Sequence, residues 1–124
     1  MGETNNNLSN MAQMIQRGSE LLRINTQKND IEYSKDGGRT WHRRYTGSLA
    51  GIFVDLFSYG PEILACTSKG IYYSKDGGNN WRNRYNNNNC GSFLQLASDG
   101  QYLLATTSKG LYYSKDGGMN WRRR

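Results

Sequence analysis

Apolar residues along the chain occur in short runs that are separated by glycine-containing turns. In the C-terminal third these runs cover residues 93–97, 102–107 and 111–115, and a lysine–glycine or aspartate–glycine pair follows each of them. Glycine after aspartate supplies the positive φ that a tight hairpin turn needs. The run 102–107 is apolar at consecutive positions, as expected for a strand that is covered on both faces. The pattern predicts short antiparallel strands rather than long helices.

The same pattern occurs three times, because the sequence repeats with a period of 40 residues. Tyr-Ser-Lys-Asp-Gly-Gly occupies residues 33–38, 73–78 and 113–118. A tryptophan follows each copy, at positions 41, 81 and 121. Before its box, the first unit aligns with the second at a shift of 42 rather than 40. The two extra residues lie in the polar stretch 26–30. A period near 40 with strand-like content is typical of propeller blades.

Each unit predicts four strands, of which the last is rich in arginine and asparagine, as suits an outer edge strand. We expect an all-β fold in which residues 10–124 form three four-stranded propeller blades, at about 10–46, 50–86 and 91–124, after a disordered tail at 1–9. Three blades leave an apolar face at each end, and known rings contain about four blades or more. We therefore expect a homodimer that completes a six-bladed ring. A fragment of a longer propeller is the alternative.

Composition adds a basic charge balance to this picture. The 124 residues include 16 lysines and arginines against 10 acidic residues, a formal net charge of +6 that favours anionic partners. No apolar run approaches the roughly 18 residues of a membrane span, and the start of the chain lacks the pattern of a secretory signal. We expect a cytoplasmic protein without membrane contact, in which Cys66 and Cys90 are free thiols.

The segment Ser-Lys-Asp-Gly-Gly-x-(Thr or Asn)-Trp resembles the Asp-box, also called the BNR repeat. Asp-boxes occur in sialidases, sortilin-type receptors and photosystem assembly factors, and the resemblance implies β-propeller blades with a structural box between the third and fourth strands. The expected box residues are Ser34, Asp36, Gly38, Trp41, Ser74, Asp76, Gly78, Trp81, Ser114, Asp116, Gly118 and Trp121. The aspartate can accept hydrogen bonds from its own turn, and the tryptophan can bury its ring over that turn.

Candidate ligand-binding residues fall into two groups. Three polar residues at one equivalent position of the first strand could line the central axis: Gln13, Asp55 and Gln95. Basic residues and tyrosines recur after the second strand and along the fourth: Lys28, Lys69, Lys109, Arg44, Arg84, Arg124, Tyr45 and Tyr85. If these arginines reach the face of the lysines, this axial face suits phosphate or carboxylate groups, and the tyrosines can stack on bases or sugars. Alternatively, the polar residues only hydrate a central channel, and the basic residues are only solvated charges at the strand edges.

Signatures of an enzyme are weak. The Asp-box suggests a sialidase, but the Arg-Ile-Pro motif of that family is missing from the sequence. The carboxylates of Asp55, Glu62 and Asp99 do not form a convincing glycosidase pair. His42 is the only histidine, which argues against a histidine-rich metal site or a histidine-based triad, and we expect no metal and no cofactor.

The favoured function is therefore non-enzymatic binding. The expected partner is anionic: a nucleic acid, a nucleotide or an acidic protein surface, as in an inhibitor encoded by a mobile element. A lectin-like carbohydrate-binding propeller is the alternative, and a glycosidase is a less favoured one.

Overall fold

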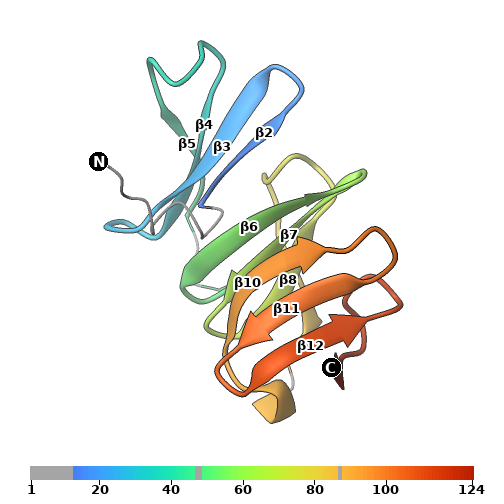
Figure 1. Ribbon diagram of the computed structural model, residues 1–124. Helices are drawn as coiled ribbons and strands as arrows, with labels where there is room; N and C mark the ends of the chain where they lie inside the picture. Colours follow the sequence, from blue (N-terminus) through green and yellow to red (C-terminus); the bar gives the residue numbers. More distant parts are fainter. Residues whose placement is uncertain (1–12, 47–48, 87) are drawn as a thin grey trace, which may run out of the picture.

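The computed structural model describes residues 13–46, 49–86 and 88–124, which fold into three four-stranded antiparallel sheets (Figure 1). The first sheet contains β2 (Met14–Arg17), β3 (Glu20–Asn25), β4 (Asp30–Ser34) and β5 (His42–Thr46). The second contains β6 (Phe53–Tyr59), β7 (Glu62–Thr67), β8 (Gly70–Ser74) and β9 (Arg82–Tyr85). The third contains β10 (Phe93–Ser98), β11 (Leu103–Thr107), β12 (Gly110–Ser114) and β13 (Arg122–Arg123). The predicted all-β class with three four-stranded units is confirmed. The expected tail at 1–9 lies outside the described residues.

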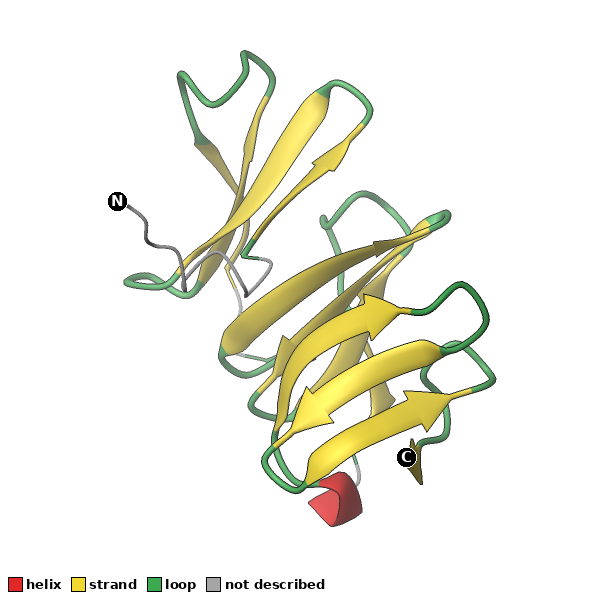
Figure 2. Cartoon of the chain, viewed as in Figure 1, coloured by secondary structure: helices red, strands yellow, loops and turns green. Residues whose placement is uncertain are grey.

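The three sheets are arranged as propeller blades. The first strands of neighbouring sheets are in contact, β2 with β6 and β6 with β10, while β5, β9 and β13 form the opposite edges (Figure 2). A bulge in β6 lies between Phe53 and Asp55, and β10 has the equivalent bulge between Phe93 and Gln95. Such bulges increase the local twist of a strand. A short 3-10 turn, η2 (Asn88–Cys90), leads into β10.

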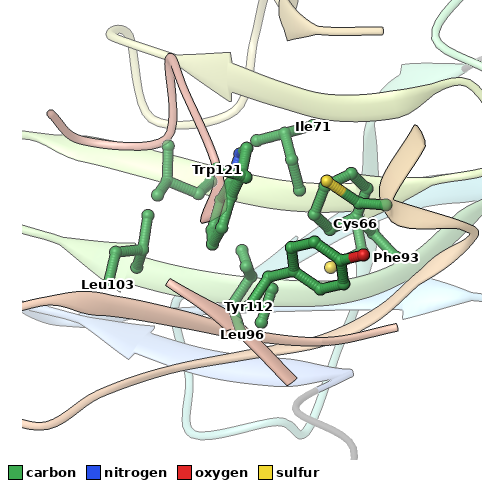
Figure 3. Close-up of a cluster of buried hydrophobic side chains, with 10 residues drawn as sticks. Cys66, Ile71, Phe93, Leu96, Leu103, Tyr112 and Trp121 are labelled. Atoms are coloured by element: carbon green, nitrogen blue, oxygen red, sulfur yellow. The ribbon is translucent and has the colours of Figure 1, made fainter. Parts of the chain in front are cut away.

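The apolar core lies between the sheets, in one cluster at each of the two contacts. Between the second and third sheets, Cys66 and Ile71 pack with Phe93 and Trp121 (Figure 3). The cluster between the first and second sheets contains Leu22, Ile24, Ile31, Phe53, Leu56 and Trp81. Both Cys66 and Cys90 are buried free thiols. Because each sheet is covered by its neighbour, the stability of one blade depends on the next.

Candidate functional site

Each Asp-box forms the same hydrogen-bonded turn between the third and fourth strands of its sheet. In the second box, the Asp76 carboxylate accepts hydrogen bonds from the backbone N–H of Asn80 (2.9 Å), from Asn80 Nδ2 (2.6 Å) and from the Ser74 hydroxyl (2.8 Å). In the first box, Thr40 provides the corresponding backbone and side-chain donors, and its hydroxyl is the main cause that lowers the pKa of Asp36 to about 2. The carboxylates therefore bind to their own turns, as the sequence predicted.

The tryptophan of each box folds back over the turn. Trp81 Nε1 donates a hydrogen bond to the Gly78 carbonyl (2.9 Å). Trp81 and Trp121 pack against a preceding sheet and are 8% exposed, whereas Trp41 of the first sheet is half-buried. Gly78 has a positive φ of 96°, and a Cβ at this position would lie 3.1 Å from Leu22 of the first sheet. Glycine therefore allows both the turn and the close approach of the blades.

Two of the predicted ligand-binding arginines join neighbouring blades. Arg84 donates hydrogen bonds to both carboxylate oxygens of Glu62 (2.7 and 2.8 Å) and to the carbonyl of Gly117 in the third sheet's Asp-box turn (3.1 Å). Its guanidinium lies over the Tyr73 ring, 4.0 Å from the centroid. Arg44 makes the equivalent contacts with Glu20, Gly77 and Tyr33. The expectation that these arginines share a face with the lysines is wrong, because the glutamates draw both side chains to the Asp-box edge.

The two predicted stacking tyrosines also pack between blades. The Tyr45 ring lies 6.0 Å from the Phe53 ring, and the Tyr85 ring lies 5.8 Å from the Phe93 ring, in edge-on contacts. The Tyr85 hydroxyl is 3.6 Å from the sulfur of Cys90. Burial is the main cause that raises the pKa of Tyr85 to about 12. Both rings contribute to the core, which corrects the expectation that they lie open to a base or a sugar.

The three polar residues of the first strands do not share one environment. Asp55 is fully buried, and its Oδ2 accepts a hydrogen bond from the backbone N–H of Leu96 in the next sheet (2.9 Å). Gln13 and Gln95 are half-buried at the equivalent positions. The expected ring of ligand-facing side chains is therefore corrected at Asp55, whose carboxylate links two blades.

The predicted lysines lie at the edge opposite the Asp-boxes. Lys28, Lys69 and Lys109 are exposed there, in the turns between the second and third strands. Lys69 Nζ donates to the carbonyl of Leu49 (3.1 Å). Arg124, in contrast, pairs with Asp99 (3.1 Å), which follows the first strand and lies at the Asp-box edge. The basic axial face expected from the sequence is thus reduced to three lysines, one in each blade.

A pocket of about 570 Å³ opens at this lysine edge between the second and third sheets. Lys69, Tyr72 and Phe93 form part of its wall, although the Phe93 side chain is buried in the core. The amides and hydroxyls around it come from Ser68, Asn83, Asn86, Ser92 and Ser108. Such a mixture of rings with hydrogen-bonding side chains suits a small polar ligand.

A second basic surface lies along the outer strands, and the interpretation of the sequence missed it. Lys75 and Arg82 border a pocket of about 520 Å³ beside the second Asp-box, and Lys115 and Arg122 border an equivalent pocket of about 470 Å³ beside the third. All four side chains are exposed. We call this surface, Lys75, Arg82, Lys115 and Arg122, the basic rim. The recurrence of a lysine and an arginine at the repeat spacing was the signal that could have revealed it.

Within the ranges 13–46, 49–86 and 88–124, no three His, Cys, Asp or Glu side chains gather as a metal site requires. Glu62 and Asp99, two of the three carboxylates weighed above for a glycosidase pair, are each bound to an arginine. In the same part of the chain, no helix has the length and apolar character needed to cross a membrane.

Comparison with known proteins agrees with this geometry. The family model described as BNR/Asp-box repeat matches residues 32–43 and 112–123. Curated proteins give no significant match. Among solved structures, YCF48 from Cyanidioschyzon merolae is similar, with a TM-score of 0.67 and 24% sequence identity over 90% of this chain. The aligned region is 37% of that chain, so the likeness concerns the fold of a part of it. The two matched segments show that this chain contains BNR/Asp-box repeats, and its three sheets have the arrangement of propeller blades.

Proposed function

We propose that this protein is a non-enzymatic binding protein whose basic rim holds an anionic partner, with a nucleic acid as the favoured class. The observation that carries the proposal is the repetition of one exposed lysine and one exposed arginine beside the Asp-box pocket of two successive blades. Arginine binds phosphate through paired hydrogen bonds, and lysine adds a mobile positive charge. A partner with regularly spaced phosphates can contact both blades at once.

The distribution of acidic groups supports this choice of surface. Glu20 and Glu62 are bound to Arg44 and Arg84 between the blades, and Glu32 is bound to Arg23. The Asp-box carboxylates accept hydrogen bonds within their own turns. The net charge of +6 leaves a surplus of cations at the surface, and in the two pockets of the basic rim a lysine and an arginine stand against one exposed carboxylate, Asp76 or Asp116. Such a surface attracts polyanions and raises their association rate at low salt.

The test compares two variants that each remove two positive charges. Binding of a labelled single-stranded oligonucleotide is measured by fluorescence anisotropy at several salt concentrations. We expect affinity to fall as salt rises, and the variant with Arg82→Ala and Arg122→Ala to bind more weakly, with a log–log salt slope that is smaller by about 1.5. The control, Lys69→Ala with Lys109→Ala, removes the same charge from the opposite edge and should change binding less.

Three results would contradict parts of this proposal. Equal losses in the two variants would place binding outside the basic rim. Binding that does not respond to salt would exclude a phosphate-dominated contact. Binding of polyglutamate in place of the oligonucleotide would change the partner to an acidic protein surface.

The pocket at the lysine edge favours carbohydrate binding as a second candidate function. Its amides and the Tyr72 ring are the groups that bind sugar hydroxyls and sugar faces. A glycan array with the unaltered protein and with Tyr72→Ala tests this candidate. Hits that disappear in the variant support it, and an array without hits removes it.

A further inference from the structure

We propose that two copies of this chain close one six-bladed ring, in which the third sheet of each copy packs on the first sheet of the other. This inference does not rest on the partner of the basic rim. It rests on the two contacts between blades that the chain already contains. Each contact joins two different surfaces. Equivalent surfaces lie on the first and third sheets, at the two ends of the described structure, where no further sheet packs on them.

The first sheet packs on the second, and the second packs on the third, through equivalent positions. The third sheet has the same surface, but no further sheet packs on it in the described structure. At the two internal contacts, four equivalent positions hold Leu22, Ile24, Ile31 and Tyr33, and then Leu64, Cys66, Ile71 and Tyr73. The third sheet has Leu104, Thr106, Leu111 and Tyr113 at these positions, and we call them the trailing face. Ile31 and Ile71 are fully buried, whereas the equivalent Leu111 is 44% exposed.

The first sheet carries the complementary surface. Met14, Leu21, Arg23 and Trp41, the leading face, stand where the second sheet has Leu56, Ile63, Ala65 and Trp81. Met14 is 56% exposed, although Leu56 is fully buried. Arg23 lies over the Trp41 ring and pairs with Glu32 (2.9 Å), so the charge on this face has its own counter-ion. The leading face can therefore be covered without leaving an unpaired cation.

The donor and the acceptor of a polar contact between blades also recur, one at each open end. Arg44 and Arg84 each donate a hydrogen bond to the carbonyl of the first glycine in the Asp-box turn of the next blade, Gly77 and Gly117. Arg124 occupies the equivalent position in the third sheet and is held by Asp99. In the first sheet, the equivalent carbonyl belongs to Gly37. In the proposed ring, Arg124 of one copy donates to the Gly37 carbonyl of the second copy, which sets the register of the contact.

The number of copies follows from the size of propeller rings. The contact joins two different faces, so repeated association gives either a closed ring or an open array. Propellers typically have about four to eight blades. Two copies with three sheets each give six blades, whereas three copies would give nine. Two copies therefore close the ring, and both open ends are covered.

Size-exclusion chromatography with light scattering tests the ring by comparing variants of the trailing face and of the leading face. The unaltered chain is expected at twice the 14.1 kDa mass of one chain. Leu111→Asp alters the trailing face and Met14→Asp alters the leading face, so each variant alone is expected at the mass of one chain. An equal mixture of the two is expected to form a pair, because one contact then has two unaltered faces. The control, Leu49→Asp, changes a leucine that is 80% exposed outside both faces and should remain dimeric.

Other results would overturn the proposal. The unaltered chain at the mass of one chain would exclude the ring, and a mass that grows beyond two chains with concentration would indicate an open array. Loss of dimer in only one variant, with no pairing in the mixture, would indicate that identical faces meet. If an aspartate variant does not fold by circular dichroism, Arg124→Ala gives an independent readout. It leaves the apolar faces intact and should weaken dimerisation by about tenfold, and unchanged dimerisation would remove the Arg124 contact.

Discussion

Replacing Arg84 with alanine is expected to lower the free energy of unfolding by about 2–3 kcal/mol. The guanidinium is largely buried and joins Glu62 to the Gly117 carbonyl of the next sheet. Its removal leaves the Glu62 carboxylate in a partly buried site without its cation, and it also removes the contact with the Tyr73 ring. Urea unfolding followed by tryptophan fluorescence measures the loss.

The neighbouring Arg82 provides a matched control for this prediction. It lies on the same strand but is exposed, and Arg82→Ala should change the free energy of unfolding by less than about 0.5 kcal/mol. Equal effects of the two substitutions would show that the contact between blades contributes little.

The pH dependence of the stability of Arg84→Ala provides a second test of this contact. The hydrogen bond from Arg84 is the main cause that lowers the pKa of Glu62 below its ordinary value of 4.5. A carboxyl with a lowered folded-state pKa stabilises the fold above its unfolded pKa, and this contribution is lost as the pH falls through the folded-state value. We therefore expect Arg84→Ala to show a smaller loss of stability below pH 4.5 than the unaltered protein.

Replacing Asp76 with alanine is expected to cost about 1–3 kcal/mol of stability without weakening the binding of an anion at the basic rim, because the carboxylate that lines this pocket is itself negative. The carboxylate accepts hydrogen bonds from the backbone and side chain of Asn80 and from Ser74, and alanine leaves these donors without an acceptor. Thermal unfolding measures the loss, and the anisotropy assay measures binding.

The adjacent Lys75 separates structure from binding in this experiment. Lys75→Ala removes an exposed charge of the basic rim without touching the hydrogen bonds of the turn, so it should weaken binding and leave the melting temperature nearly unchanged. An Asp76→Ala variant that melts normally but no longer binds would reverse the assignment of the Asp-box as structural.

The parts of the fold that depend on nearby residues could be predicted from the sequence. The hydrogen bonds of Asp36 reach only residues of the same motif, Ser34, Arg39 and Thr40, so the local motif contains all the information for the turn. The strands follow from the same repeated pattern of apolar runs and glycines. Because their neighbours are copies of themselves, the packing of the blades could be inferred as well.

The direction of the arginines could not be predicted in the same way. Arg44 is held by Glu20, which precedes it by 24 residues, and by Gly77, which follows it by 33 residues. The fourth strand also contains a bulge beside Ile31, which changes the side of the strand that the last residues face. Recurrence of a glutamate at 20 and 62 with an arginine at 44 and 84 was the available signal. Solvent exposure, which separates the basic rim from these arginines, depends on packing that the residue types alone do not show.

The contact between blades bears on how the number of repeat units in such a chain can change. Each repeat unit carries one leading face and one trailing face. A duplicated unit placed between two others therefore meets an equivalent surface on each side. Duplication or loss of a whole unit therefore leaves matching surfaces between the units that remain. Unequal recombination within the repeated gene segment can alter the number of blades in one step, while each surviving copy stays compatible with its neighbours.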